Sequence, residues 1–128
     1  MYRKTKNTGV FKDISEPMQL RHVRHVAQKY GIDLEGIGIR IERDETIIGS
    51  GYFGLANPKY FKKGRIHLLP DAFISEEELA RTIYHEKAHL EQFHKYGYDN
   101  VINNRKMYED DVDELEKEYF ENKGWLAR

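Results

Sequence analysis

The sequence predicts an α+β fold, in which a small, twisted, mostly antiparallel sheet packs on a long helix and a second long helix follows toward the C-terminus. Two stretches in the second half repeat apolar residues at helical spacing, and one in the first half alternates apolar and polar residues as half-buried strands do. With 128 residues, the chain has the usual size of one domain. We expect the polar and basic residues 1–13 to be flexible and residues 14–128 to form that domain.

The first of the two long helices is predicted to begin near Glu76 and to continue as far as Gly97. Ser75 is a suitable N-cap, and Glu78 three residues later completes a capping box. Apolar residues keep returning to one side of this helix: Leu79, Ala80, Ile83, Tyr84, Ala88 and Leu90. The pattern therefore predicts an amphipathic helix with a definite start.

Five residues of this helix read His-Glu-Lys-Ala-His, which is the HExxH pattern, and a helix places the two imidazoles on one face beside a carboxylate. A catalytic zinc ion takes three protein ligands and keeps one position open for water. His85 and His89 therefore need a third donor. Glu109 is the best candidate, and Asp113 and Glu116 are its substitutes.

The second long helix contains Glu109 and is predicted to be capped by Asn103 or Asn104 and ended by Gly124. Its apolar stripe has helical spacing: Tyr108, Val112, Leu115 and Tyr119. Glu109 lies beside that stripe and is expected to face the first helix. Asp113, one turn further along, is expected to accept the free ring N–H of a ligating histidine, which fixes the tautomer of the ligand.

Taken together, these residues predict a hydrolytic mechanism. Zinc lowers the pKa of a bound water toward neutrality, and Glu86 is placed to take the proton as a general base and to deliver it to the leaving amine. The developing oxyanion also needs a donor. Tyr108 is the first candidate for that role, and four others remain open: Tyr96, Tyr98, Arg105 and His94.

The arrangement resembles the gluzincin metallopeptidases, which combine HExxH with a downstream glutamate on a second helix, often followed four residues later by an acidic or amide residue. The matching positions are His85, Glu86, His89, Glu109 and Asp113. The chain is more similar to the compact zincin domains of phages and mobile elements, including the ImmA/IrrE type, than to a large secreted protease. The resemblance covers about residues 64–120. It implies a zincin-like domain with one zinc ion per chain and a metallopeptidase activity, which in so small a domain suggests an endopeptidase of narrow specificity.

A second class of function remains open, namely a non-catalytic module that keeps the zincin-like architecture, with or without metal, in order to bind another protein. Glu86 discriminates between the two classes, because only a catalyst depends on its carboxylate. Either reading makes the partner of this chain a polypeptide.

The first half of the chain predicts a helix followed by strands. Ser15 is a suitable helix cap with Pro17 in the first turn, and Gly31 ends the helix. Residues 37–41 alternate isoleucine with glycine and arginine, which indicates a half-buried strand. We expect this strand to extend through a turn to residues 47–48.

A hairpin is predicted next, pairing residues 52–55 with residues 65–69 across the loop 57–64. We expect Arg65–Leu69 to be an edge strand beside the helix that carries HExxH. Its unpaired N–H and C=O groups would then hold an extended peptide by strand addition.

Composition narrows the remaining possibilities. The chain has no cysteine, so it has neither a thiolate metal site nor a disulfide framework. The formal net charge of −1 argues against a general nucleic-acid binder. With neither a secretory signal nor an apolar stretch long enough for a membrane, we expect a cytoplasmic monomer that does not bind membranes.

Overall fold

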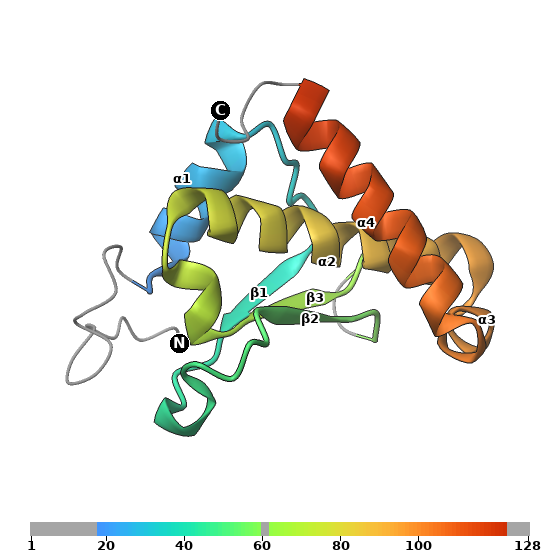
Figure 1. The fold of residues 1–128 in the computed structure, drawn as a ribbon, viewed down its shortest axis with the longest axis horizontal. Coiled ribbons are helices and arrows are strands. Elements are labelled where there is room, and N and C mark those ends of the chain that lie inside the picture. Colours follow the sequence, from blue (N-terminus) through green and yellow to red (C-terminus); the bar gives the residue numbers. More distant parts are fainter. Residues whose placement is uncertain (1–17, 60–61, 123–128) are drawn as a thin grey trace.

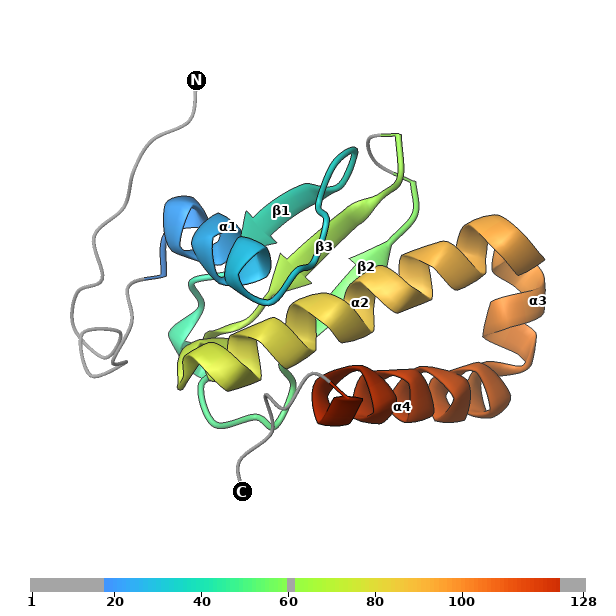
Figure 2. The same ribbon diagram turned by 90° about the horizontal axis from the view of Figure 1, so that it is seen from above.

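The computed structural model describes residues 18–59 and 62–122, and the fold is α+β as predicted (Figure 1). Its elements in chain order are α1 (Leu20–Lys29), β1 (Gly38–Ile41), the 3-10 turn η2 (Glu45–Ile47), β2 (Gly54–Asn57), β3 (Arg65–Leu68), the 3-10 turn η3 (Pro70–Phe73), α2 (Glu76–Tyr96), α3 (Tyr98–Asn103) and α4 (Arg105–Asn122). Helix α2 covers one face of the sheet, and α4 lies alongside α2 after a reversal through α3 (Figure 2).

The sheet is mixed and has the strand order β1-β3-β2. The predicted hairpin is confirmed, since β2 pairs antiparallel with β3 and Leu55 lies opposite His67. Strand β1 pairs parallel with β3, however, so the prediction of a mostly antiparallel sheet was wrong for one of the two pairs. The prediction that Arg65–Leu69 forms an edge strand was also wrong, because β3 is the central strand. Alternation identifies the buried face of a strand but not its neighbours.

Strand β1 does not extend to residues 47–48. The Asp44 carboxylate accepts hydrogen bonds from the Thr46 backbone N–H at 2.9 Å and from the Thr46 hydroxyl at 2.7 Å. This local turn competes with strand pairing and starts the 3-10 turn η2. The apolar residues after it therefore do not continue the sheet.

Helix α1 begins at Leu20, later than predicted, with Gln19 in extended conformation at the N-cap. The proposed cap Ser15 and Pro17 lie outside the described residues, as do residues 1–13. The bounds of helices α2 and α4 agree closely with the prediction. The Ser75 hydroxyl accepts a hydrogen bond from the Glu78 backbone N–H at 3.0 Å, which confirms the cap of α2.

Helix α4 departs from the prediction in two details. Asn104 precedes it, but its side-chain amide donates to Asn100 in place of capping α4. Leu115, placed in the apolar stripe, is exposed, while Tyr108, Val112 and Phe120 are buried. The buried side of α4 is therefore narrower than the sequence pattern indicated.

The core lies between the sheet, α1 and α2. Its completely buried side chains come from these elements, from the residue Met18 before α1, from η3 and from the end of α4: Met18, Val23, Val26, Ile66, Leu68, Phe73, Leu79, Ile83, Leu90 and Phe120. Among the described residues, no helix has the combination of length and apolar character needed to cross a membrane.

Gly64, just before β3, lies close to Leu90 of α2. It has a φ of +105°, and a Cβ atom there would lie 2.5 Å from Leu90 Cδ2 and 2.9 Å from the Asn57 carbonyl oxygen. Both the backbone conformation and the space require glycine.

We predict that Gly64→Ala lowers the free energy of unfolding by about 2–4 kcal/mol, from backbone strain together with overpacking against α2. Gly49→Ala is the matched control, since Gly49 also has a positive φ but nothing lies within 4 Å of its added Cβ. The control should lose only about 1 kcal/mol. Urea unfolding of both variants measures the difference, and equal losses would show that the contact with Leu90 does not matter.

Candidate metal centre

The packing of α4 on α2 brings three predicted ligands to one point. Glu109 Oε1 lies 2.6 Å from His85 Nε2, and Glu109 Oε2 lies 2.9 Å from His89 Nε2. The two Nε2 atoms are 3.2 Å apart. His85, His89 and Glu109 therefore form a group that could hold a metal ion.

The spacing of the two imidazoles suits tetrahedral coordination. Zinc–nitrogen bonds at tetrahedral angles separate two nitrogen ligands by about 3.3 Å. The observed separation of 3.2 Å between the Nε2 atoms of His85 and His89 is close to that value. The Glu109 oxygens lie closer than this, at 2.6 Å and 2.9 Å from the two Nε2 atoms, so the carboxylate would have to move outward to share an ion with both rings.

Each imidazole has an acceptor on its other nitrogen. Nδ1 of His85 lies 3.0 Å from Glu116 Oε1, whereas Asp113, the partner expected from the sequence, lies 3.6 Å away. Glu116 also accepts from Arg81 at 2.9 Å. It is seven residues after Glu109, which is two helical turns, so both carboxylates face α2. This spacing was the signal in the sequence that could have identified Glu116 in this role.

The second imidazole has a partner that the sequence analysis missed. Nδ1 of His89 lies 3.0 Å from Oε1 of Gln92, one turn further along α2. The Gln92 side chain is buried, and its Nε2 donates to the backbone oxygen of Tyr108 at 2.9 Å. A buried glutamine three residues after a candidate ligand was the available signal.

Glu86 lies on the side of α2 that faces β2. A Cβ atom at Gly54 would be 3.4 Å from Glu86 Cγ and 3.0 Å from Thr82 Cγ2, so the glycine allows the strand to approach the helix here. Burial raises the pKa of Glu86 to about 7, and the charges of Glu109 and Glu116 add to that effect although His85 opposes it.

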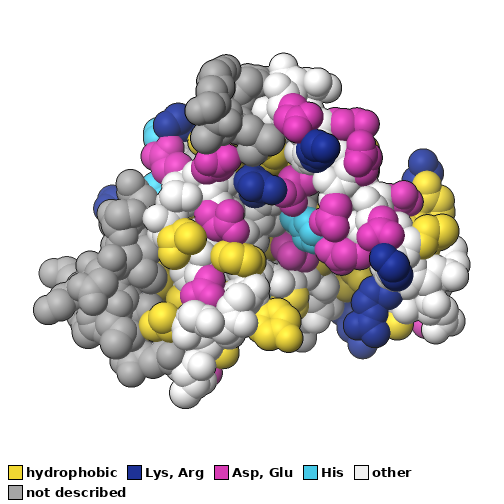
Figure 3. Space-filling model, viewed as in Figure 1, with side chains coloured by type: hydrophobic (Ala, Val, Ile, Leu, Met, Phe, Trp, Pro, Cys, Tyr) yellow, Lys and Arg dark blue, Asp and Glu magenta, His cyan; other side chains and the backbone are white. Residues whose placement is uncertain are grey.

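His85 is surrounded by carboxylates, and its pKa reflects this. Burial alone lowers the pKa, but the hydrogen bond with Glu116 and the charges of Glu86, Glu109 and Glu116 outweigh burial and raise the pKa to about 9. The same negative surroundings that retain a proton on this ring favour a cation. Acidic side chains also gather over α4 around a histidine on the surface (Figure 3).

A cleft of about 730 Å³ contains the site. It follows the direction of α2, with Glu78, Arg81 and Thr82 before the two histidines and Phe93 after them. Apolar and aromatic residues from outside α2 also line the cleft: Phe53, Leu55, Ala56, Val101, Ile102 and Tyr108. The cleft therefore continues past the candidate metal centre on both sides.

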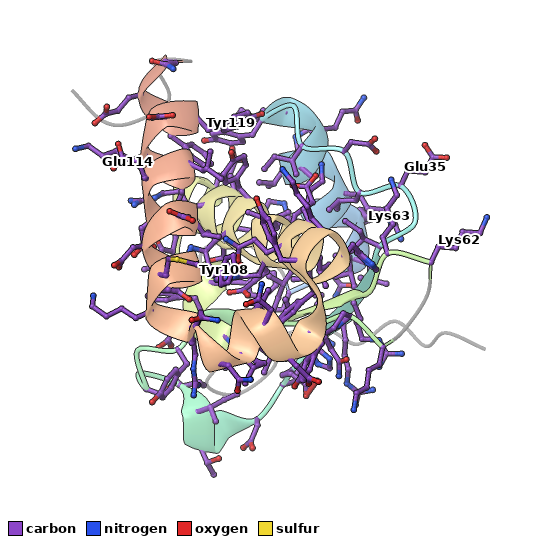
Figure 4. All side chains as sticks on the ribbon, turned by 90° about the vertical axis from the view of Figure 1, so that its right-hand side faces the viewer. Glu35, Lys62, Lys63, Tyr108, Glu114 and Tyr119 are labelled. Carbon is purple, nitrogen blue, oxygen red and sulfur yellow. The ribbon has the colours of Figure 1, made fainter. Side chains whose placement is uncertain are left out.

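The oxyanion candidates occupy different places. Tyr108 and Arg105 line the cleft, and Tyr108 points from α4 toward the body of the molecule, while Glu114 points away from it (Figure 4). The hydroxyl of Tyr108 accepts a hydrogen bond from Asn100 Nδ2 at 3.0 Å. His94 has its Nε2 3.0 Å from the backbone oxygen of Lys63, on the loop before β3.

Comparison of the chain with protein-family models, with curated proteins and with solved structures finds no match.

We predict that the metal-free protein becomes less stable as the pH rises from about 7 to about 9. The pKa of His85 is about 9 in the folded chain and about 6.5 in a model peptide, so its contribution is complete below the lower value and is lost as the pH passes the higher one. Thermal unfolding with a chelator present measures this, and His85→Gln should remove the decline. A decline of equal size in the variant would contradict the assignment to His85.

Proposed function

We propose that this chain is a zinc-dependent metallopeptidase, an endopeptidase of narrow specificity. The observation that carries the proposal is the convergence of His85, His89 and Glu109, with Glu86 beside them, in a cleft bordered by a strand. A second group among the described residues, His85 with Asp113 and Glu116, shares His85 but offers only one imidazole, and Asp113 does not line the cleft.

The donor set favours zinc. Two imidazole nitrogens and one carboxylate are the ligands of a common type of catalytic zinc site, whereas calcium and magnesium are held mainly by oxygen atoms. Both histidines are half-buried and line the cleft, so a water molecule could reach an ion held between them. When bound, zinc would polarise the carbonyl of the substrate and activate that water.

We assign to Glu86 the two proton transfers of the proposed hydrolysis, from the water and to the leaving amine. It is adjacent to His85 in the chain but is absent from the group that could hold the metal. In this proposal its carboxylate accepts a proton from the attacking water and returns it to the nitrogen of the leaving amine, and its place in the lining of the same cleft supports that role.

The strand that would hold the substrate is β2, which replaces β3 in the role predicted from the sequence. The Leu69 backbone N–H donates to the Phe53 oxygen at 2.9 Å, so Phe53 faces β3. In an antiparallel pair this direction alternates along the strand, which turns the N–H and C=O groups of Gly54 and Ala56 to the open side. Both residues line the cleft. An extended peptide can therefore add to β2 across from the candidate metal centre.

The resemblance of the sequence to compact gluzincins supports the same proposal, and the shape of the cleft suggests the narrow specificity. Because the cleft continues on both sides of the histidines, a chain can pass through it, as an endopeptidase requires. Its volume of about 730 Å³ accommodates only a short segment in contact with the walls. Recognition would then depend on a few side chains near the cleaved bond.

We predict that Glu86→Gln lowers cleavage of a random peptide library at least about 100-fold while one zinc ion per chain remains bound. Glu109→Gln should lose most of the zinc. Glu114→Gln is the matched control, since this glutamate lies on α4 but points away from the site (Figure 4). Elemental analysis gives the zinc content, and mass spectrometry gives the cleavage.

The same experiment separates a peptidase from the binding module. A wild-type protein that binds zinc but cleaves no peptide would favour the binding module. A wild-type protein without zinc, even after incubation with the ion, would contradict the metal centre itself.

We predict that Ala56→Pro lowers peptide cleavage roughly tenfold, because it removes one N–H donor to the substrate. Proline is tolerated on an edge strand when its nitrogen faces outward, so zinc content and thermal stability should stay near those of the wild type. Ala56→Val adds comparable volume and keeps the N–H, and it should keep the activity. Equal activity in both variants would exclude pairing at Ala56.

A further inference from the structure

We propose that Gln92 is a positioning residue that fixes the tautomer of His89 and ties this ligand to the backbone that carries Glu109. The inference rests on the metal centre proposed above. It holds that a neutral side chain helps to orient two of the three candidate ligands. Three observations carry it, namely the orientation of the amide, its burial, and the identity of its two partners.

The orientation of the Gln92 amide follows from the partner on α4. The backbone oxygen of Tyr108 can only accept, so the group 2.9 Å from it must be the Nε2 of Gln92. The other end of the amide, Oε1, then faces Nδ1 of His89 at 3.0 Å. Since Oε1 can only accept, Nδ1 must carry the hydrogen.

This arrangement determines which nitrogen of His89 is available to a metal. A neutral imidazole has one N–H, and with that hydrogen on Nδ1 the lone pair is on Nε2. Nε2 is the atom that faces His85 and Glu109. Without Gln92, the carboxylate of Glu109, 2.9 Å from Nε2, would favour the hydrogen on Nε2 and so block the ligand atom.

The second contact of Gln92 acts on the third ligand. The Tyr108 oxygen belongs to the peptide group that joins Tyr108 to Glu109, so the hydrogen bond from Gln92 holds the backbone from which Glu109 extends. The Gln92 side chain therefore links His89 on α2 with the backbone of α4 from which Glu109 extends.

An amide is suited to both contacts in a way that other groups are not. Gln92 is only 7% exposed, so water does not readily replace either partner. A carboxylate there would accept from His89 but would repel the Tyr108 oxygen, and an apolar side chain would leave the Nδ1–H of His89 without its acceptor and would remove the side-chain donor to the Tyr108 oxygen. The donor and the acceptor must come from the same end of one side chain.

The test compares Gln92→Met, which keeps the length but loses both hydrogen bonds, with Gln92→Glu, which keeps only the acceptor. Gln28→Met on the exposed side of α1 is the matched control. Long-range proton–nitrogen NMR on the metal-free proteins reports which nitrogen of the neutral His89 ring is protonated. Competition with a chelator gives the affinity for zinc.

We expect Gln92→Met to shift the His89 hydrogen from Nδ1 to Nε2 and to weaken zinc binding by about 10- to 100-fold. Gln92→Glu should keep the hydrogen on Nδ1 and bind zinc with an affinity between those of Gln92→Met and wild type. The control should match wild type in both measurements. If Gln92→Met is too unstable to purify, Gln92→Glu still tests the link to α4 through its zinc affinity.

The proposal is overturned if Gln92→Met keeps the hydrogen on Nδ1 and binds zinc as wild type does. It is also overturned if that variant loses only thermal stability, since a purely structural role would leave the tautomer unchanged. The tautomer is measured without metal, so a shift in Gln92→Met supports the role of Gln92 even if wild type binds no zinc. Failure of the metal centre would then be distinguished from failure of this inference.

Discussion

The register of α4 on α2 is the constraint on which the candidate site depends, because two of its ligands are on one helix and the third on the other. Contacts at both ends of α4 set this register. Near its C-terminus, Tyr119 stacks on Tyr84 with ring centroids 4.5 Å apart and donates to the Tyr30 oxygen at 2.5 Å. Near its N-terminus, Tyr108 accepts from Gln92. A shift of one residue would turn Glu109 about 100° away from the histidines.

Once the register is set, electrostatics determine what the site can hold. Glu86, Glu109 and Glu116 surround His85 within a partly buried region, and this many carboxylates repel one another unless a proton or a metal ion neutralises them. Arg81 compensates Glu116 through a direct ion pair, with 2.8 Å between Nη2 and Oε2. Glu109 has only the two imidazoles as partners within this group. A divalent cation between them would satisfy all three groups at once, which a proton on one ring cannot do.

The local features of the site were predictable from the sequence, and the tertiary ones were only partly so. The cap at Ser75 and the helical spacing of His85 and His89 depend on neighbours within one turn, so pattern alone identified them. Glu109 was found because chemistry required a third ligand. Gln92 was missed because its importance depends on a backbone oxygen of α4, which no spacing rule reveals. The central place of β3 was missed for a similar reason, since strand alternation does not specify partners.

The strand order leaves β2, and not β3, available for the peptide pairing proposed above. A central β3 has both edges occupied, so it could not have accepted an added strand, whereas β2 has one open edge and lies against α2. Gly54 is the residue that permits this closeness, because any side chain there would meet Thr82 and the His67 oxygen. Because Gly54 has no side chain, β2 can lie close to α2, and the open backbone groups of β2 then line the same cleft as Glu86. A peptide paired with β2, as proposed, would lie in the cleft that contains both that carboxylate and the candidate metal centre, so its backbone would be held beside both groups.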